Sequence, residues 1–310
     1  MLHLIAGGGH PQMAQAIARE LGVELTPVTL ARYPDAELVR IDGSIRNGDI
    51  YIVQPTPPSP EPHLIELLLI ADAARRAGAA RICAVTPYVG YSRQDRRAAG
   101  DRTAVGGRVV ANMVDSGGFD RFVTVDLHQP AMEGFFSTPV EHIEAFGPLL
   151  EALREASPRG TVVAPDVGAA KLADRFAEAL SLPMAVVHKT RLSGTEVVAT
   201  RVTGDVAGRT PIIVDDMITT GGTVRAAVEA VTSAGAHGPV TVAVTHGIFS
   251  AEAPARLAGL GIERLIATDT VPITSDGIPG LQVVSIAPML AETIRRLHDG
   301  SSIAHLRSKR

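Results

Sequence analysis

Short apolar, β-prone runs alternate along the whole chain with stretches whose apolar residues recur at helical spacing. The strand-like runs cover residues 2–6, 49–54, 81–86, 122–126, 161–164, 184–187, 211–214, 240–245, 264–267 and 282–286. The helical patterns cover residues 11–21, 62–77, 168–180, 223–234 and 288–297. Regular alternation of strands and helices is typical of α/β folds with largely parallel sheets. The sequence therefore predicts an α/β protein.

The same scheme runs through both halves of the chain, which predicts two domains. At 310 residues the chain is long enough for two domains of roughly 150 residues each. The pattern breaks near residues 145–149, so we expect an N-terminal domain over residues 1–146 and a C-terminal domain over residues 147–287. The C-terminal helix, within residues 288–300, could pack back on the first domain.

Composition and charge narrow the function classes. The hydrophobic fraction is 45%, the charged fraction is 20% and the formal net charge is −4. An acidic balance disfavours nucleic acid as a partner, because a phosphate backbone is bound by a basic surface. No apolar run reaches the ~18 residues that a membrane-spanning helix needs, and the first residues lack the basic segment of a signal peptide. We therefore expect no membrane association, a cytoplasmic location and a buried thiol at the single cysteine, Cys83.

The stretch Pro211-Ile-Ile-Val-Asp-Asp-Met-Ile-Thr-Thr-Gly-Gly-Thr-Val224 carries the strongest functional signal. An apolar strand is expected to end in two adjacent carboxylates, Asp215 and Asp216, and a Thr/Gly loop leads into a helix that begins near Thr223. Small residues let backbone amides approach an anion, and a helix N-terminus adds partial positive charge. The loop therefore favours a phosphate, and the carboxylates favour ribose hydroxyls, held directly or through magnesium. It is not a Walker A loop, which would end in Gly-Lys-Ser/Thr.

This stretch resembles the ribose-5-phosphate-binding loop of type I phosphoribosyltransferases and of their relatives, the phosphoribosyl pyrophosphate synthetases or ribose-phosphate pyrophosphokinases. The resemblance implies two similar phosphoribosyltransferase-type domains, each a mainly parallel sheet flanked by helices. The ribose-5-phosphate-binding residues that it implies are Asp215, Asp216, Thr219, Thr220, Gly221, Gly222 and Thr223. Synthetases usually carry an acid where this chain has Thr219, so any carboxylate role at that position is lost or moved.

Segments of the first half favour the synthetases. The run Thr86-Pro-Tyr-Val-Gly-Tyr-Ser-Arg-Gln-Asp-Arg-Arg97 resembles their Pro-Tyr-x-Gly-Tyr-x-Arg-Gln-Asp pattern. Val123-Thr-Val-Asp-Leu-His-Gln-Pro-Ala-Met-Glu-Gly-Phe-Phe136 is similar to their metal- and ATP-binding signature, and Arg32-Tyr-Pro-Asp-Ala-Glu37 resembles the segment that reaches into a neighbouring subunit's ATP site. The ATP-binding residues that these matches imply are Tyr33, Asp35, Glu37, Arg93, Gln94, Asp95 and His128. A shared site requires at least a dimer, and the family suggests a homo-oligomer, a hexamer built from dimers.

The resemblance also implies magnesium and two catalytic cations. It makes His128 and Asp166 the metal-binding positions, whereas the preference of Mg²⁺ for oxygen ligands would by itself make His128 a phosphate donor or a general acid. Lys189 and Arg191 match two cations of a flexible loop that closes over the transferring diphosphate. The implied reaction is attack of the 1-hydroxyl of ribose 5-phosphate on the β-phosphorus of ATP, with AMP leaving. The cations can neutralise the negative charge that accumulates on the non-bridging oxygens.

Two other functions fit part of the pattern. A catalytically silent, synthetase-associated regulatory subunit would keep the fold, but the retained Lys189, Arg191 and His128 argue against it. A phosphoribosyltransferase that uses a nucleobase needs only one such domain and none of the ATP-type segments. Residues 98–108 depart from the Pro-Ile-Ser-Ala-Lys pattern of the synthetases. This region and Ser44-Ile-Arg46 match parts of the family that contribute to regulation by phosphate and ADP.

Overall fold

The structure of the 310-residue chain is a computed structural model that describes residues 1–98, 100–154, 159–191, 197–273 and 276–307. The side chains of residues 189–191, 197–200 and 307 lie outside the described part. The chain forms two compact units. Unit 1 contains residues 1–144, 270–272 and 286–310, and unit 2 contains residues 145–269 and 273–285. Both ends of the chain therefore belong to unit 1.

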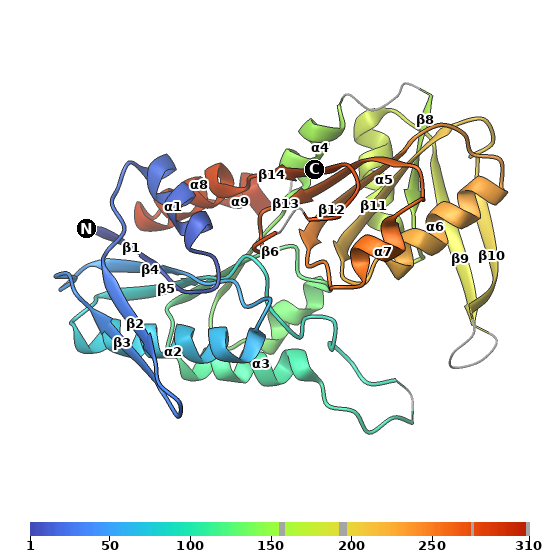
Figure 1. Cartoon of the computed structure of the whole chain (residues 1–310). Coiled ribbons are helices and arrows are strands. Elements are labelled where there is room, and N and C mark those ends of the chain that lie inside the picture. Colours follow the sequence, from blue (N-terminus) through green and yellow to red (C-terminus); the bar gives the residue numbers. More distant parts are fainter. Residues whose placement is uncertain (99, 155–158, 192–196, 274–275, 308–310) are drawn as a thin grey trace. The chain divides into compact units, whose positions relative to one another are not determined.

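Unit 1 is built on a parallel sheet whose strands follow one another in chain order. The order is β1 (Leu2–Ala6), β4 (Asp49–Val53), β5 (Arg81–Val85), β6 (Arg121–Val125) and β7 (Val140–Ile143). Its helical elements are α1 (Pro11–Leu21), α2 (Pro60–Arg76), α3 (Gly106–Ser116), the 3-10 helix η1 (Pro130–Phe135), α8 (Ala287–His298) and α9 (Ala304–Arg307). Helix α1 packs against α8 on one face of the sheet, and α2 and α3 cover the other face (Figure 1).

Burial on both faces explains the apolar character of these strands. Ile52, Ala84 and Phe122, in three neighbouring strands, are fully buried. A strand covered by helices on both faces needs apolar side chains at nearly every position. Polar groups that meet a ligand are therefore expected mainly where a strand ends, at the edges of the sheet.

A two-stranded antiparallel hairpin, β2 (Val28–Arg32) and β3 (Glu37–Ile41), is joined to unit 1 without entering its sheet. The strand-like runs of the sequence did not predict it. One side of the hairpin is half-buried against the core of unit 1, next to α2. The hairpin tip, residues 33–36, is exposed.

Unit 2 is built on a larger sheet with the strand order β10-β9-β8-β11-β12-β13-β14. Its strands are β8 (Gly160–Ala164), β9 (Met184–Arg191), β10 (Val197–Gly204), β11 (Thr210–Ile218), β12 (Val240–Gly247), β13 (Ile262–Thr268) and β14 (Leu281–Val284). Its helices are α4 (Phe146–Leu153), α5 (Ala170–Leu180), α6 (Gly222–Ser233) and α7 (Ala253–Leu257). Only β10 pairs in the antiparallel sense.

The strand order of unit 2 reverses between β8 and β11. From β8 the chain passes through α5 to β9 on one side, and from β11 it passes through α6 to β12 on the other. Helices α4 and α5 share one buried cluster with the sheet, and α6 shares another. Ligands of open α/β sheets bind outside the carboxyl ends of the strands at such a reversal point.

The α/β class with two mainly parallel sheets flanked by helices is confirmed. Two expectations about strand ends are wrong. β11 continues through Asp215 and Asp216 to Ile218, because β12 pairs with it as far as Gly247. β9 continues to Arg191, because β10 pairs with it there, so the polar residues from 188 to 191 are strand rather than loop.

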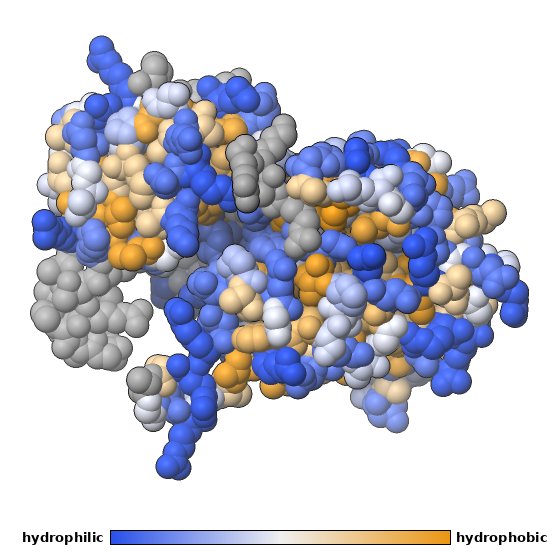
Figure 2. All heavy atoms as spheres, turned by 180° about the vertical axis from the view of Figure 1, so that it is seen from behind, coloured by the Kyte–Doolittle hydropathy of each residue, from blue (hydrophilic) through white to orange (hydrophobic). Residues whose placement is uncertain are grey.

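The surface mixes hydrophilic side chains with small apolar groups over the face shown in Figure 2. Exposed large apolar side chains, among them Tyr33, Ile65, Val109 and Val283, are spread over separate elements. Within the described part of the chain, every helix is too short or too polar to cross a membrane.

Candidate active site

The reversal point of unit 2 gathers three acidic candidates. Asp215 and Asp216 lie in the last part of β11, and Asp166 follows the end of β8, the strand that pairs with β11. Neighbouring parallel strands bring their carboxyl ends to the same edge of the sheet. The charge of Asp166 is close enough to act on Asp215. The structure therefore brings Asp166 close to the adjacent pair Asp215 and Asp216, which follows it by about fifty residues in the sequence.

Asp215 holds its proton more tightly than an ordinary aspartic acid. Burial raises the pKa of Asp215 well above its usual value, and the charge of Asp216, followed by that of Asp166, raises it further. The amide of Asp216 donates a hydrogen bond to Asp215 Oδ1 at 2.9 Å, which acts in the opposite direction. A bound cation or a set of hydroxyl donors would stabilise the ionised carboxylate of Asp215 and so offset the cost of burial and charge repulsion.

The loop after β11 leaves the start of α6 open. Gly221 has a φ of 77°, a left-handed conformation that a residue with a Cβ adopts only with strain. As the N-cap residue of α6, Gly221 has no side chain that could cap the helix by a hydrogen bond. The first amides of a helix have no partner within the helix, and Thr220 and Thr223 are half-buried beside them. Amides and hydroxyls in this arrangement suit a phosphate.

Asp166 also supports the helix that follows it. Its Oδ1 accepts hydrogen bonds from the amides of Gly168, at 2.9 Å, and Ala169, at 3.3 Å, just before α5. Ala169 is the N-cap residue of α5. Its methyl group is buried in the core beneath α5, so it does not narrow the loop.

A pocket of about 390 Å³ lies at the carboxyl edge of the unit 1 sheet. Its lining comes from the start of α2 and from the loop after β5: Pro60, Glu61, Tyr88, Tyr91, Arg93 and Gln94. The volume falls in the range of small-ligand sites, roughly 300–1,000 Å³. Arg93 and Gln94 therefore line one pocket, whereas Asp95, half-buried, is outside the described lining.

The loop that carries Arg93 and Gln94 is held from two sides. Tyr91 has a φ of 64°, which is uncommon outside glycine, and its hydroxyl donates to the carboxylate of Glu61 on α2. The amide of Gly107, on α3, donates to the carbonyl of Gln94 at 3.1 Å. A Cβ at Gly106 would collide with the Gln94 side chain. Strained backbone held by its surroundings is common at functional sites.

His128 is half-buried in the loop after β6, and two residues that the sequence reasoning missed support this loop. The amide of Leu127 donates to His142 Nε2 at 3.0 Å, and His142 Nδ1 lies 3.0 Å from Glu133 Oε1. Because Nε2 accepts a hydrogen bond, the ring proton is on Nδ1 and is donated to Glu133. His142 lies in β7, which the apolar runs did not reveal, so no sequence signal pointed to it.

The three candidates on the hairpin do not behave alike. Tyr33, 55% exposed, and Asp35 lie at the tip, free to meet another molecule. Glu37 turns inward and shares a hydrogen bond with Glu66 of α2. Burial raises the pKa of Glu37, and the hydrogen bond with Glu66 raises it further. In this structure Glu37 therefore faces Glu66 of α2 and not the solvent at the hairpin tip.

Lys189 and Arg191 lie in β9, where the backbone pairs with Thr200 and Val197 of β10. Their side chains, and residues 192–196 of the predicted flexible loop, lie outside the described part of the chain. The antiparallel pair β9 and β10 forms the edge of the unit 2 sheet (Figure 1).

Comparison with known proteins places the chain in a family. A sequence model of the N-terminal domain of ribose phosphate pyrophosphokinase matches residues 2–118, and a model of a phosphoribosyl synthetase-associated domain matches residues 192–308. The ribose-phosphate pyrophosphokinases of Corynebacterium efficiens and Mycobacterium tuberculosis (strain H37Rv) are each 41% identical, over 98% of this chain and 95% of theirs. The chain belongs to the ribose-phosphate pyrophosphokinase family. It is an enzyme of that family.

A solved structure agrees with this family membership. The crystal structure of phosphoribosylpyrophosphate synthetase from Mycobacterium smegmatis matches with a TM-score of 0.90 and 40% identity. The match covers 97% of this chain and 99% of that chain. The resemblance first found in short motifs thus extends over the fold of a ribose-phosphate pyrophosphokinase.

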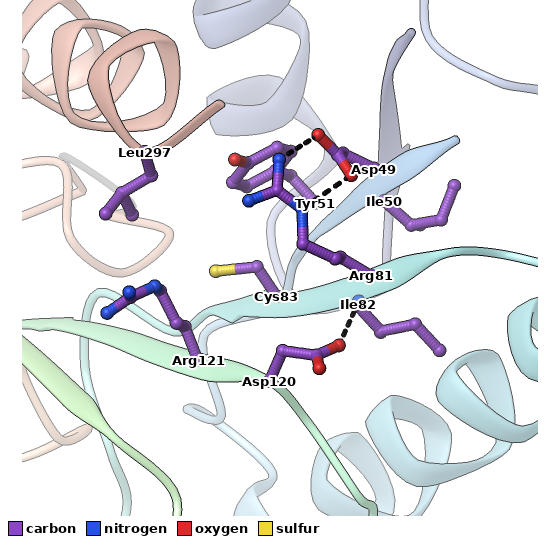
Figure 3. Close-up of a pocket in the computed structure, with 9 residues that line it drawn as sticks. All are labelled: Asp49, Ile50, Tyr51, Arg81, Ile82, Cys83, Asp120, Arg121 and Leu297. Atoms are coloured by element: carbon purple, nitrogen blue, oxygen red, sulfur yellow. Dashed lines mark hydrogen bonds and ion pairs between the residues drawn. The ribbon is translucent and has the colours of Figure 1, made fainter. Parts of the chain in front are cut away.

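A second cavity of unit 1 is unsuited to the substrates of such an enzyme. It lies at the amino edge of the sheet, between strands β4 to β6 and Leu297 of α8, and its volume is about 30 Å³ (Figure 3). That is room for about one water molecule. Cys83 lines it and is 6% exposed, which confirms the expectation of a buried thiol. Burial raises the pKa of the Cys83 thiol, so the thiolate form is disfavoured.

No group of three or more His, Cys, Asp and Glu side chains among the described residues is arranged to hold a metal ion. Magnesium commonly keeps several waters and takes only one or two carboxylates together with substrate phosphates. The adjacent carboxylates of Asp215 and Asp216, with the raised pKa of Asp215, fit that chemistry. The imidazole of His128 fits it less well, because nitrogen is a poorer ligand for Mg²⁺.

Proposed function

We propose that the protein transfers the β,γ-diphosphate of ATP to the 1-hydroxyl of ribose 5-phosphate, giving 5-phosphoribosyl 1-diphosphate and AMP. The observation that carries this proposal lies in unit 2. A helix N-terminus whose N-cap residue is a glycine follows a partly buried acid pair at the point where the strand order reverses. An anion site beside a hydroxyl or cation site matches a sugar phosphate. The names of the relatives supply the reaction.

Ribose 5-phosphate is proposed to bind at the end of β11. The amides of Gly221, Gly222 and Thr223 and the hydroxyls of Thr219, Thr220 and Thr223 would hold its phosphate, as the open start of α6 suggests. Asp215 and Asp216 would accept hydrogen bonds from the ribose hydroxyls. The sugar would thus be fixed at both ends, so that its 1-hydroxyl has one orientation.

ATP is proposed to bind unit 1 through the pocket of Arg93 and Gln94. The aromatic rings of Tyr88 and Tyr91 line the same pocket and suit a planar base. Arg93 would contact the phosphates, and the Gln94 side chain would contact the adenine edge. His128 and Asp95 complete the proposed set.

Magnesium is the proposed cofactor, and it would neutralise part of the phosphate charge during transfer. The residues of this chain that would hold magnesium are His128 in unit 1 and, in unit 2, Asp166 and the acid pair Asp215 and Asp216. Asp166 already uses Oδ1 to cap the start of α5, which leaves Oδ2 for a cation or its water. The carboxylates also orient the sugar, so they act in binding and positioning.

Lys189 and Arg191 are the proposed catalytic cations. Phosphoryl-type transfer depends on positioning and on neutralising charge, so no nucleophilic side chain is required. The proton of the attacking 1-hydroxyl must leave as the bond to phosphorus forms. An ionised carboxylate at the acid pair could accept a hydrogen bond from the ribose as this occurs.

The active form is proposed to be a homo-oligomer, a hexamer built from dimers. Tyr33 and Asp35 support this because they are exposed at the tip of a hairpin that stands apart from the sheet. A neighbouring subunit's ATP site would use this tip. Sedimentation of the active enzyme is expected to show at least a dimer, and a fully active monomer would contradict the shared site.

The proposed function is tested by incubating the protein with ATP, magnesium and ribose 5-phosphate. We expect AMP and 5-phosphoribosyl 1-diphosphate in equal amounts, as measured by ion-exchange chromatography or phosphorus NMR. Failure to form AMP at any phosphate concentration would leave the silent regulatory subunit as the better assignment. Consumption of phosphoribosyl pyrophosphate with a nucleobase, without ATP, would point to a transferase.

The role of the catalytic cations is tested by Lys189→Ala. We expect turnover to fall by about 10²–10³-fold, as for other groups that stabilise transition-state charge. ATP binding, measured by titration calorimetry, should change little, because the lysine acts on the transferring group. Lys171→Ala, on the exposed face of α5, is the matched control. Loss of ATP binding with unchanged turnover at saturation would show that the assigned role is wrong.

A further inference from the structure

The segment after β12, residues 248–250, is hydrogen-bonded to the start of the proposed phosphate loop, residues 219–223. The amides of Ile248 and Phe249 donate to the carbonyl of Ile218 at 2.9 and 3.2 Å, and the amide of Ser250 donates to the carbonyl of Thr219 at 2.9 Å. Phe249 has a φ of 38°, so this turn is held in a conformation that residues other than glycine rarely adopt. The loop is therefore fixed to the sheet before any ligand arrives.

Helix α7 extends this support and brings a cation to the loop. Leu257 packs on Gly221, where an added methyl group would lie 3.1 Å from its Cγ. An added methyl group at Gly222 would lie 3.6 Å from Arg256 Nη1. The guanidinium thus stands beside the first residue of α6, where the open amides are. None of the motifs in the sequence pointed to Arg256, because it lies more than thirty residues beyond the loop.

The guanidinium is currently paired with an exposed acid. Arg256 Nη2 lies 2.6 Å from Glu252 Oε2, and the two side chains are 43% and 62% exposed. Ion pairs as exposed as this contribute little to stability. A phosphate dianion can accept two parallel hydrogen bonds from a guanidinium, which is a stronger arrangement. Exchange of Glu252 for a bound phosphate is therefore favourable.

A second arginine near the loop is directed elsewhere. Arg225 lies in the first turn of α6, but its Nε donates to Glu229 Oε1 at 2.8 Å. Glu229 lies one turn further along the helix, so this contact draws the Arg225 guanidinium away from the open amides. The loop follows the carboxyl groups of Asp215 and Asp216, and Asp166 lies close enough to act on Asp215. A dianion bound there gains from a nearby cation, and Arg256 is in position to supply one.

We propose that Arg256 is an additional binding residue for the phosphate group of ribose 5-phosphate. In the free protein the Arg256 guanidinium is instead paired with Glu252. The proposal rests on the proposed function, since it concerns the same sugar-phosphate site. In the bound state Arg256 turns from Glu252 to the phosphate held by the α6 amides. The phosphate then lies between helix amides on one side and a guanidinium on the other.

The test uses three variants of the full-length protein. Arg256→Gln removes the cation, and Glu252→Gln releases it. Arg209→Gln is the matched control, because Arg209 Nε pairs with Asp205 Oδ2 at 2.8 Å in a similar exposed pair next to the first residue of β11, at the opposite edge of the sheet. All three positions are on the surface, and circular dichroism will verify their folding. Steady-state kinetics and calorimetric titration with ribose 5-phosphate and with ribose are the measurements.

Arg256→Gln should raise KM for ribose 5-phosphate and its calorimetric Kd by roughly tenfold, the value of one charge-assisted contact. KM for ATP and kcat should stay near the wild-type values. Glu252→Gln should lower the Kd by roughly twofold, since it removes a weak competitor. Arg209→Gln should leave both constants unchanged. Ribose, which has no phosphate, should bind the wild type and Arg256→Gln equally.

The outcomes separate the two proposals. An unchanged Kd for ribose 5-phosphate in Arg256→Gln, or an equal rise in Arg209→Gln, would overturn the role of Arg256. Weaker binding in Glu252→Gln would also overturn it, because release of the guanidinium should help. A wild-type protein that binds ribose 5-phosphate but forms no AMP would contradict the proposed function, while the Kd values would still decide the role of Arg256.

Discussion

The carboxyl edges of the two sheets handle acidic side chains in opposite ways. At the edge of unit 2, Asp215 is partly buried beside Asp216 and Asp166, and its pKa is raised by burial first and by these negative neighbours second. At the edge of unit 1, Glu66 is only 4% exposed, yet it receives the amide of Gly8 at 2.5 Å and the side-chain amide of Gln54 at 2.7 Å. Asp215 thus has mainly acidic neighbours, whereas Glu66 accepts hydrogen bonds from donors within the protein.

The glycine-rich loop after β1 illustrates the difference. Gly7, Gly8 and Gly9 precede α1, as a phosphate-binding loop would. A Cβ on Gly8 would lie 2.9 Å from Glu66 Oε2, so the carboxylate fills the space that an external anion would need. A glycine loop at a helix N-terminus is therefore no evidence of a ligand until its surroundings are known. At Gly222, the first residue of α6, the atoms nearest an added Cβ are Arg256 Nη1 and Thr220 Oγ1, both at 3.6 Å, which are a cation and a hydroxyl rather than a carboxylate.

Topology explains why only one of the two edges is left open. In unit 2 the strand order reverses between β8 and β11, and neighbouring loops then diverge to leave a crevice. In unit 1 the sheet strands follow chain order, and the edge near β1 and β4 is closed by α2 and the hairpin. The ligand pocket of unit 1 lies further along, beside the loop after β5.

The largest effect on turnover is expected for Asp215→Asn. This variant tests whether the buried acid of unit 2 serves substrate binding at a cost in stability. Turnover should fall by about 10²-fold or more, as is usual when a group that contacts the reacting substrate is lost. Stability at neutral pH should rise by roughly 0.5–2 kcal/mol, because a buried like-charge contact is removed. Chromatographic assay of AMP and thermal unfolding are the measurements.

The pH dependence of that variant sharpens the test. A raised pKa means that the folded state binds the proton more tightly than the unfolded chain. Unfolding free energy should therefore fall as pH rises from 3.8, the ordinary value, through the raised value of Asp215. Asp215→Asn should lack this decline, whereas Asp174→Asn, at an exposed position of α5, should retain it. If the unfolding free energies of wild type and Asp215→Asn depended on pH in the same way, Asp215 would not have a raised pKa, and the proposed difference between the two sheet edges would be wrong.

Glu66→Ala should have the next largest effect, this time on stability alone. It leaves the amide of Gly8 and the side chain of Gln54 without their acceptor and creates a cavity, so unfolding free energy should fall by roughly 2–4 kcal/mol. Glu66→Gln keeps an oxygen acceptor and should cost less than half as much. Urea unfolding measures both. A similar loss of unfolding free energy in the two variants would contradict the assigned role, because Glu66→Gln keeps an oxygen acceptor and should retain part of the hydrogen bonding.

The smallest effect is expected at the amino edge of unit 1, away from both sites. Asp49 accepts hydrogen bonds from Arg81 (Figure 3), and it lies 2.7 Å from His298 Nδ1. These contacts lower the pKa of Asp49, with Arg81 the larger cause. The stabilisation is present above the ordinary value of 3.8 and is lost as pH falls through the lowered value. Because Arg81 is half exposed, Asp49→Asn should cost only about 1 kcal/mol. Denaturant unfolding at pH 7 and pH 3 measures this, and a loss at pH 3 as large as that at pH 7 would contradict it.

The sequence alone predicted the α/β class and the positions of most sheet strands, because apolar runs and helical periodicity are local properties. Helix α1 was predicted over the observed residues, and α6 was predicted to within one residue. The hairpin β2–β3, strands β7 and β10 and helix α3 were missed. Neither strand of the hairpin has a fully buried residue, so the hairpin lacks the apolar run that marks a central strand. Helix α3 begins with Gly106 and Gly107, which are poor helix formers.

For the candidate site, the sequence determined which residues could do the chemistry. Asp215, Asp216 and the Thr/Gly loop are consecutive, and their spacing alone indicates a sugar phosphate. The tertiary structure decided which distant residues join them. Strand pairing brings Asp166 to the acid pair, α7 brings Arg256 to Gly222, and α2 turns Glu37 inward onto Glu66. These contacts depend on the order of strands and the packing of helices, which no short segment encodes, and they decide whether a charged side chain is free to bind a ligand.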